Sequence, residues 1–230
     1  MNYNKKYIVD LQSRFNGSLK LAAIGDALGW ITEFEKSKQS LFNKYGTKNI
    51  DCFYSWKKNV GGRFHGYTDK IKKGSYSDDT QLILAVARSI DGNGIVNQKY
   101  FSKVELPDWL KYSRGAGRTV KNAARKIQRK SANWNNNFYK YKVGEKTIDY
   151  RECGANGAAM RILPIALANF NDFQRIKEEI FKNSIITHGH PRAIVGAILY
   201  GLSVDTILKE KPESFDIRSF ITKIGKNMSN

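Results

Sequence analysis

The spacing of apolar residues constrains the fold more than any other feature of this sequence. From Tyr7 to about Trp30, the apolar positions are Ile8, Leu11, Phe15, Leu19, Ala22 and Ala23. Side chains at this three-to-four spacing share one face of a helix. A second such pattern follows Ser77 and ends at Gly92-Asn93-Gly94, a typical helix end. Weaker helical patterns cover residues 98–112, 119–128, 158–169, 173–186 and 191–209.

The sequence therefore predicts an all-α fold. We find no convincing alternation of apolar and polar residues in the core regions, so a sheet-based fold has little support. We expect a single compact multi-helix domain over residues 1–230, with no internal repeat and no linker. Residues 37–74 and 131–151 interrupt the helical pattern and are expected to form long surface loops, which in compact domains often serve as lids.

Length and cysteine content indicate the setting of the protein. A chain of 230 residues buries enough surface for a core without disulfides. Cys52 and Cys153 match no metal-binding spacing and are too few for a secreted scaffold, which favours a reducing compartment. The N-terminus lacks an apolar targeting region, and the stretch Ala193 to Val204 is too short to span a bilayer. We expect a cytoplasmic protein that makes no membrane contact.

The chain is strongly basic, with 39 Lys and Arg against 21 Asp and Glu and a formal net charge of +18. Such a charge attracts anionic partners, including nucleotides and nucleic acid. The basic cluster of residues 111–130 contains Arg114, Arg118, Lys121, Arg125 and Arg129. At this spacing they would form one helical stripe, suited to nucleic acid. The alternative is a solvated basic face, and AT-rich coding alone would produce the abundance of Lys and Asn.

Ser77-Asp78-Asp79-Thr80 is the strongest local signal, because adjacent carboxylates lie where a loop meets a helix. The Ser77 hydroxyl and the two carboxylates are oxygen ligands suited to a divalent ion such as Mg²⁺. The structural alternative is that Ser77 caps the helix while the two aspartates favour its first turn. Both interpretations stay open at this point.

Gly25-Asp26-Ala27-Leu28-Gly29 is a second signal, followed by Glu33 seven residues after Asp26. Seven residues make two helical turns, so Asp26 and Glu33 are expected to point the same way. The two glycines, one turn apart, suggest a close backbone approach. The structural alternative is a buried, hydrogen-bonded Asp26 and an exposed Glu33.

Two further segments carry polar groups near predicted helix starts. Residues 156–161, Asn-Gly-Ala-Ala-Met-Arg, would present free backbone N–H groups to an anion or a ribose hydroxyl. Residues 187–192, Thr-His-Gly-His-Pro-Arg, lie between two predicted helices. A zinc site there is improbable because other ligands are scarce. One of the two histidines is expected to be a hydrogen-bonding residue at a pocket wall, and the alternative is that the loop caps the following helix.

Taken in order, these four segments resemble the successive signature segments of the ADP-ribosylglycohydrolase family, which includes the dinitrogenase reductase-activating glycohydrolases. The resemblance runs from about Phe15 to Gly201. It implies an all-helical domain with a two-metal Mg²⁺ or Mn²⁺ centre that holds the sugar of ADP-ribose.

The resemblance also implies roles for individual residues. Ser77, Asp78 and Asp79 match the first group of metal ligands, and Glu33, or Asp79 itself, would serve in catalysis. Gly115 and Gly117 fall where the family has a phosphate loop, in which glycines let backbone N–H groups approach a pyrophosphate. Asn156, Gly157 and His188 match positions that line the ADP-ribose cleft.

The sequence departs from the family pattern in one respect. The family completes its metal site with a Gly-Asp-x-Asp-[Ser/Thr] segment near the C-terminus, and the sequence has no Asp-x-Asp. Asp205-Thr206 lies in a predicted helix too close to His188 to be that segment. The expectations are a fragment truncated at its C-terminus, one partner of a split enzyme whose other chain completes the metal site, or a degenerate member.

Three functions follow from these features. The leading one is hydrolysis of the glycosidic bond between ADP-ribose and an acceptor such as a modified protein, helped by metal ions and by carboxylate acid–base catalysis. The second is a non-catalytic module that binds ADP-ribose or another protein. The third is nucleic-acid binding through the basic stripe, and an ADP-ribosylated nucleic acid would combine it with the first.

Overall fold

The computed structural model describes residues 5–33, 35–61, 66–115 and 117–229. Its α-helices are α1 (Lys5–Gly29), α2 (Lys38–Tyr45), α3 (Asp78–Arg88), α4 (Gln98–Tyr100), α5 (Leu106–Tyr112), α6 (Arg118–Ile127), α7 (Leu163–Ala168), α8 (Phe173–Ser184), α9 (Pro191–Lys209) and α10 (Ile217–Ser229). The shorter helical turns are the π-helical η1 (Phe101–Glu105) and the 3-10 turns η2 (Tyr150–Glu152), η3 (Ala159–Arg161) and η4 (Pro212–Ser214). The mostly helical fold is confirmed.

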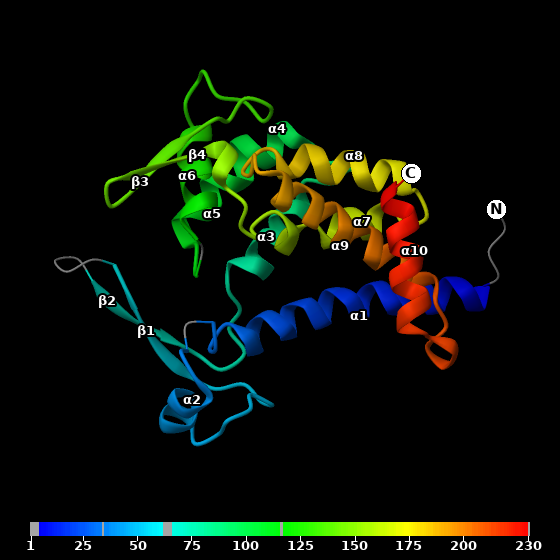
Figure 1. Ribbon diagram of the computed structural model, residues 1–230, viewed down its shortest axis with the longest axis horizontal. Coiled ribbons are helices and arrows are strands. Elements are labelled where there is room, and N and C mark those ends of the chain that lie inside the picture. Colours follow the sequence, from blue (N-terminus) through cyan, green and yellow to red (C-terminus); the bar gives the residue numbers. More distant parts are fainter. Residues whose placement is uncertain (1–4, 34, 62–65, 116, 230) are drawn as a thin grey trace.

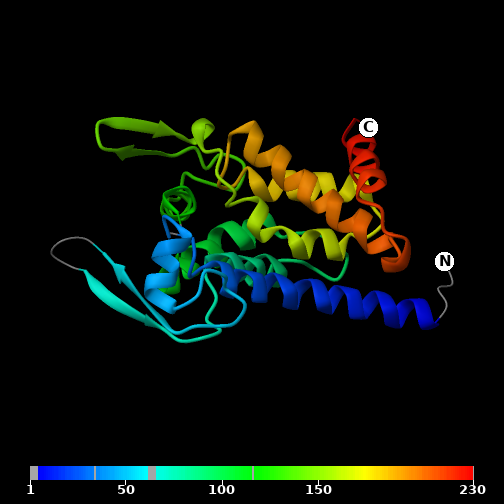
Figure 2. The same ribbon diagram turned by 60° about the horizontal axis from the view of Figure 1, so that its bottom comes forward.

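The strands form two separate antiparallel hairpins, β1 (Trp56–Val60) with β2 (Tyr67–Ile71) and β3 (Lys140–Val143) with β4 (Lys146–Asp149). They lie in the two segments predicted to be loops, so the prediction of irregular structure there is wrong in part. Helix α2 also lies in the first of these segments. Both hairpins project from one end of the molecule, opposite α10 and the start of α1 (Figures 1 and 2).

The main core lies between α3, α5, α7, α8 and α9. Leu82 of α3, Trp109 of α5 and Ile180 of α8 are fully buried in it. Helices α8 and α9 pack so closely that a Cβ on Gly201 would lie 2.2 Å from Cδ1 of Ile180. Burial of this apolar face, at about 25 cal/mol per Å², is the main term that holds the bundle together.

Helix α1 lies along one side of this bundle (Figure 2). Phe15 meets Phe170 edge-on, with ring centroids 5.6 Å apart. The Arg14 guanidinium donates hydrogen bonds to the carbonyls of Leu208 (3.1 Å) and Glu210 (2.7 Å) at the end of α9. These contacts fix the direction of α1, so that its C-terminal end reaches the N-terminus of α3.

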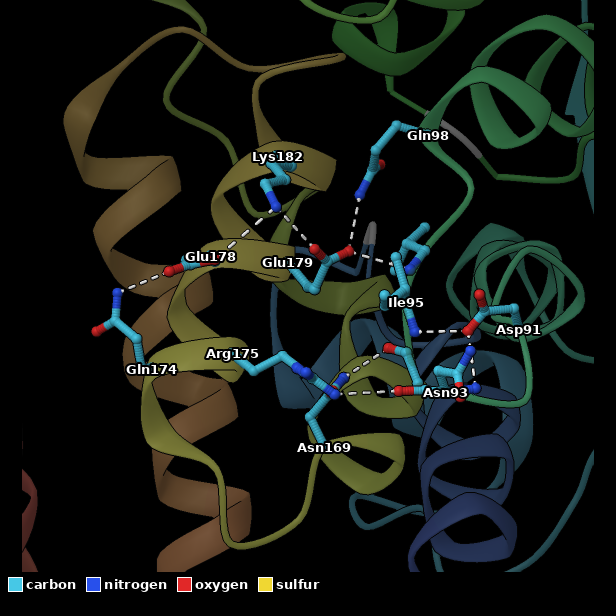
Figure 3. A network of polar contacts seen from close by, with 12 residues as sticks. Asp91, Asn93, Ile95, Gln98, Asn169, Gln174, Arg175, Glu178, Glu179 and Lys182 are labelled. Carbon is cyan, nitrogen blue, oxygen red and sulfur yellow. Dashed lines mark hydrogen bonds and ion pairs between the residues drawn. The ribbon is translucent and has the colours of Figure 1, made fainter.

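A polar network holds the link between α3 and α4 against α8 (Figure 3). The buried Glu179 carboxylate accepts hydrogen bonds from the Val96 N–H (3.0 Å) and the Gln98 side chain (3.4 Å), and it pairs with Lys182 at 2.9 Å. The Asn169 amide donates to the Gly94 carbonyl at 2.8 Å. These bonds satisfy buried polar groups, and the network has a structural role.

The predicted helix over residues 98–112 is interrupted by the π-turn η1. Pro107 lies two residues after the end of η1, and proline has no N–H to donate to the preceding turn. The Leu106 N–H instead donates to the Phe101 carbonyl, five residues back. Helix α10 was not predicted at all, although Ile217, Phe220, Ile221 and Ile224 have helical spacing.

The apolar stretch 193–204 belongs to the 19-residue α9. Within the described ranges, α9 is the helix long and apolar enough, by length and composition, to cross a membrane. It also packs against α7, α8 and α10. Its Asp205 side chain is fully buried and paired with Lys209 at 2.6 Å. Inside the structure, 39% of the apolar window of α9 is buried.

Candidate functional site

A cleft of about 880 Å³ opens where the end of α1 meets the start of α3. The loop after α5, strand β3, residues 155–160 and the loop before α9 complete its walls. The predicted site residues that line it are Glu33, Ser77, Asp78, Asp79, Gly115, Gly117, Asn156, Gly157 and His188. The fold thus brings together the segments that lie far apart in the sequence.

The N-terminus of α3 is capped from two sides. Ser77 is the N-cap residue, and its hydroxyl accepts the Asp79 N–H at 3.3 Å. From α1, the Asp26 carboxylate accepts the N–H groups of Ser77 and Thr80, each at 3.0 Å, and the Thr80 hydroxyl at 2.6 Å. Asp26 therefore has the structural role that was the alternative for it, with its oxygens engaged in holding α1 to α3.

Asp78 and Asp79 form the acidic end of the cleft. Burial, reinforced by the neighbouring Asp79 carboxylate, raises the pKa of Asp78 to about 7. Burial, together with Asp26 and Glu33, raises the pKa of Asp79 to about 6. Desolvation and like charges both oppose ionisation of these groups. A bound cation would relieve both effects, so this end of the cleft favours a positively charged occupant.

Glu33 reaches the same cleft by a route other than the predicted one. Helix α1 ends at Gly29, where the carbonyl accepts the Thr32 N–H at 2.9 Å and the Thr32 hydroxyl at 2.8 Å. Glu33 therefore lies in a tight turn beyond the helix and does not share a helical face with Asp26, although both residues line the cleft. Glu33 is an exposed residue at the rim of the cleft. Partial burial of its carboxylate nevertheless raises the pKa of Glu33.

The β1–β2 hairpin adds two residues that the sequence did not single out. Trp56 packs edge-on against Trp30, with ring centroids 5.2 Å apart, and the Lys58 ammonium lies 5.6 Å from the Trp30 ring centroid. Burial lowers the pKa of Lys58, and Glu33 and Asp78 are near enough to oppose that shift. This approach was not predictable from the sequence, because it depends on where the hairpin folds back.

The glycine loop after α5 touches the acidic end directly. Gly115 has φ +90°, and a Cβ there would lie 2.6 Å from the Asp78 carboxylate and 3.1 Å from the Trp30 indole nitrogen. Only glycine fits without displacing Asp78. Ala116 lies outside the described residues, and Gly117 is the N-cap of α6.

Among the described residues, those that line the opposite wall of the cleft include no carboxylate. A Cβ on Gly157 would lie 2.9 Å from the His188 ring. His188 is fully buried, its Nδ1 lies 2.8 Å from the Thr187 hydroxyl, and its Nε2 has no hydrogen-bond partner within the described structure. Burial, with the nearby Arg161 charge, lowers the pKa of His188 to about 3, so the ring is neutral.

Arg161 fixes this wall from beneath. The guanidinium is fully buried and donates to the Gly157 carbonyl (2.7 Å) and to the side chain and carbonyl of Asn183 (2.9 and 2.8 Å). It also lies over the Phe101 ring, 5.3 Å from the centroid. Burial lowers its pKa to about 9. The predicted helix 158–169 begins here as the 3-10 turn η3, because Pro164 starts a new helix, α7.

Gly25 and Gly29 do not mediate the close backbone approach that their spacing suggested. A Cβ at either position would meet no other atom within 4 Å, and both residues line the cleft. They keep the cleft open where larger side chains would narrow it.

The acidic end of the cleft offers oxygen donors, but among the described residues it has fewer acidic groups than a complete metal site needs. None of the described His, Cys, Asp and Glu side chains gather in a group of three or more that could hold a metal ion. Asp78 and Asp79 offer two carboxylates and Ser77 a hydroxyl, while Asp26 is engaged elsewhere. These are the hard oxygen donors that Mg²⁺ accepts, with water filling the remaining positions. They fit one ion, and the described chain offers no second such group.

The predicted basic stripe is divided by the fold. Lys111 lies on α5 and pairs with Asp108 at 2.6 Å. Arg114 lies in the loop before α6 and pairs with Asp69 of β2 at 3.4 Å. The prediction of one helical stripe from Arg114 is therefore wrong, because the helix does not begin until Arg118.

The fold and cleft define a mostly helical domain with an acidic site at a helix N-terminus, and comparison with known proteins places it. The ADP-ribosylglycohydrolase family model matches residues 8–229. The chain belongs to this family. It is 29% identical over 201 residues to the ADP-ribosyl-[dinitrogen reductase] glycohydrolase of Rhodospirillum rubrum. That match covers 86% of this chain and 59% of the relative, so the chain spans little more than half of the relative's length.

Proposed function

We propose that this chain acts in hydrolysis of the glycosidic bond that joins ADP-ribose to an acceptor. The observation that carries the proposal is the convergence of residues from separate segments on one cleft, in a chain of the ADP-ribosylglycohydrolase family. The name of the Rhodospirillum rubrum relative describes removal of ADP-ribose from a protein, which supports an ADP-ribosylated protein as substrate.

The two ends of the cleft suit different parts of such a substrate. Gly115, Gly117, Asn156 and Gly157 line the cleft, and their backbone and amide groups would contact phosphates and ribose hydroxyls, Gly115 from beside Asp78. The buried Nε2 of His188 has no hydrogen-bond partner among the described residues and would bond to the same ligand. At the acidic end, Glu33 or Asp79 would accept a proton from the attacking water or donate one to the leaving group. The acceptor would leave through the rim beside Glu33.

Ser77, Asp78 and Asp79 would hold a Mg²⁺ or Mn²⁺ ion at this end. When bound, such an ion supplies positive charge that orients sugar hydroxyls and activates water. A complete centre of two ions would need further ligands, from a partner chain or from groups outside the described set. With the described residues alone, we expect weak Mg²⁺ binding and slow turnover, because Mg²⁺ prefers a full octahedral shell.

The proposal is tested by calorimetry and thermal unfolding with ADP-ribose and Mg²⁺, beside an assay for ADP-ribose released from a modified protein. We expect ADP-ribose to bind, and Mg²⁺ to raise the melting temperature of the wild type but not of Asp78→Asn. Gly157→Ala, which crowds His188, should weaken ADP-ribose binding and leave the Mg²⁺ effect intact.

Three results would change this conclusion. Absence of ADP-ribose binding would contradict the proposal. Binding without any release of ADP-ribose would favour the non-catalytic module, which the incomplete ligand group also supports. Rapid metal-dependent release by this chain alone would show that other acids complete the site.

A further inference from the structure

We propose that a groove between α6 and β3, distinct from the cleft, binds single-stranded nucleic acid. Its volume is about 360 Å³. Its lining residues are Asn122, Arg125, Lys126, Arg129, Phe138, Tyr139 and Lys140. Binding in this groove does not depend on the proposed hydrolase function.

The first argument is charge. Four of the lining residues are cations and none is a carboxylate. Lys140 pairs with Asp149 at 3.3 Å, whereas Arg125, Lys126 and Arg129 have no acidic side chain within ion-pair distance in the described chain. Arg125 and Arg129 are exposed. Arg125 lies in the last turn of α6 and Arg129 just beyond its end. A row of phosphates would relieve the repulsion between these like charges.

The second argument is an exposed aromatic ring beside these charges. Phe138 is 57% exposed, and the edge contact of its ring with Tyr150, at 5.3 Å, holds it in place. Next to it, Tyr139 is buried and its hydroxyl donates to the Thr187 carbonyl at 2.7 Å. A fixed, exposed ring in a basic groove is the arrangement on which unpaired bases stack. An acidic peptide would use the charges but would not need this ring.

The third argument is continuity with the cleft. Arg118 and Thr119 of α6 line the cleft, and Arg125 of the same helix lines the groove. These arginines are about 10 Å apart along the helix at 1.5 Å per residue. Tyr141 of β3 lines the cleft and stacks on Tyr139 at 6.2 Å between ring centroids. An oligonucleotide in the groove can thus extend toward the cleft. An ADP-ribose group on that oligonucleotide would then enter the cleft, and this last step alone rests on the proposed function.

The test is fluorescence anisotropy with a fluorescein-labelled single-stranded DNA of about 16 nucleotides, repeated at several salt concentrations. Arg125→Gln/Arg129→Gln should bind at least tenfold more weakly at low salt. The slope of log affinity against log salt should flatten by about 1.4, because each lost phosphate contact on a single strand contributes about 0.7. Phe138→Leu keeps the apolar contact and the charge, and should weaken binding without changing this slope.

The matched control is Arg218→Gln/Lys226→Gln on α10. It also removes two positive charges, but at the opposite end of the molecule (Figure 1). We expect it to bind like the wild type, with circular dichroism confirming that every variant is folded. Equal weakening by both double variants would overturn the proposal in favour of diffuse charge. Equally tight binding of labelled polyglutamate, with no effect of Phe138→Leu on the DNA, would overturn it in favour of an acidic polypeptide.

Discussion

Gly115 shows how one missing side chain sets the geometry of the acidic end. Because its φ is +90° and a Cβ would lie 2.6 Å from the Asp78 carboxylate, Gly115→Ala should cost on the order of 1–3 kcal/mol of stability. It should also displace Asp78 and reduce the rise in melting temperature with Mg²⁺. Urea unfolding and thermal unfolding with and without Mg²⁺ measure the two effects.

Gly117→Ala is the matched control for Gly115, because a Cβ at Gly117 would meet no other atom within 4 Å and its φ is −67°. We expect a small loss of stability from the N-cap position alone. If the two alanine variants were equally stable and responded equally to Mg²⁺, the contact between Gly115 and Asp78 would have no energetic role.

His188 gives the folded state a defined pH dependence. Its pKa is lowered to about 3 by burial, so below its ordinary pKa of about 6.5 the unfolded chain binds a proton that the folded chain does not. The contribution of His188 to the free energy of unfolding is complete above this ordinary pKa and is lost as the pH falls below it. At pH 5 the loss is about 2 kcal/mol, at about 1.4 kcal/mol per pH unit.

The measurement is urea unfolding of the wild type and His188→Gln at about pH 7.5 and about pH 5. The stability advantage of the wild type should shrink by about 2 kcal/mol at the lower pH. Because the pKa values of Asp78 and Asp79 are raised in the folded state, these two groups increase the free energy of unfolding as the pH falls. The increase is the same in the wild type and in His188→Gln, so it cancels in the comparison. His190→Gln is the control. If the stability difference between the wild type and His188→Gln were the same at both pH values, His188 would not be buried in its neutral form.

At the residue scale, the sequence predicted which side chains share the cleft. It did not predict the contacts that bring them together. The nine predicted site residues line one cleft, because they were taken from segments that resemble the successive signature segments of the family. The contacts of Lys58 and of Arg161 were not predicted, although Arg161 belongs to the 156–161 segment. Their positions depend on a hairpin folding back and on a buried network, neither of which leaves a periodic pattern in the sequence.

At the element scale, the hydrogen bonds from Ser77 and Thr80 of the α3 N-terminus to the Asp26 carboxylate of α1 position the cleft. Asp26→Ala removes the acceptor for two backbone N–H groups and one hydroxyl. The loss should be on the order of 2–4 kcal/mol, since these donors would be left partly buried and unpaired. Chemical denaturation measures it.

Asp10→Ala is the matched substitution on the same helix, because Asp10 is exposed and makes a surface pair with Arg14 at 2.9 Å. We expect a change below about 0.5 kcal/mol there. A similar small change for Asp26 would mean that α1 is held to the bundle by its apolar contacts alone.

Helices were predictable and hairpins were not, for a physical reason. Long helices bury one face, so their periodicity is visible, as in α1 and α9. The strands are four or five residues long and mostly exposed, which leaves little apolar alternation. The available signal was Gly144-Glu145, the two-residue turn between β3 and β4, with alternation in the preceding Lys140-Tyr141-Lys142-Val143.

At the scale of the whole molecule, charge of opposite sign is kept apart within one end of the protein. The cleft gathers Asp26, Glu33, Asp78 and Asp79, whereas the neighbouring groove gathers Arg125, Lys126, Arg129 and Lys140. The net charge of +18 attracts anions to the surface in general. We expect the acidic end of the cleft to discriminate among them, because a bare phosphate would be repelled at that end unless a cation accompanied it.

The capping of α3 by Asp26 also links the site to the motions of the folded state. The Ser77 and Thr80 amides are bonded to a carboxylate on another helix, so their exchange with solvent deuterons requires α1 to move away from α3. The same opening event would separate Glu33 from Asp78. The exchange rates of these two amides thus report how often the cleft comes apart while the rest of the bundle stays folded.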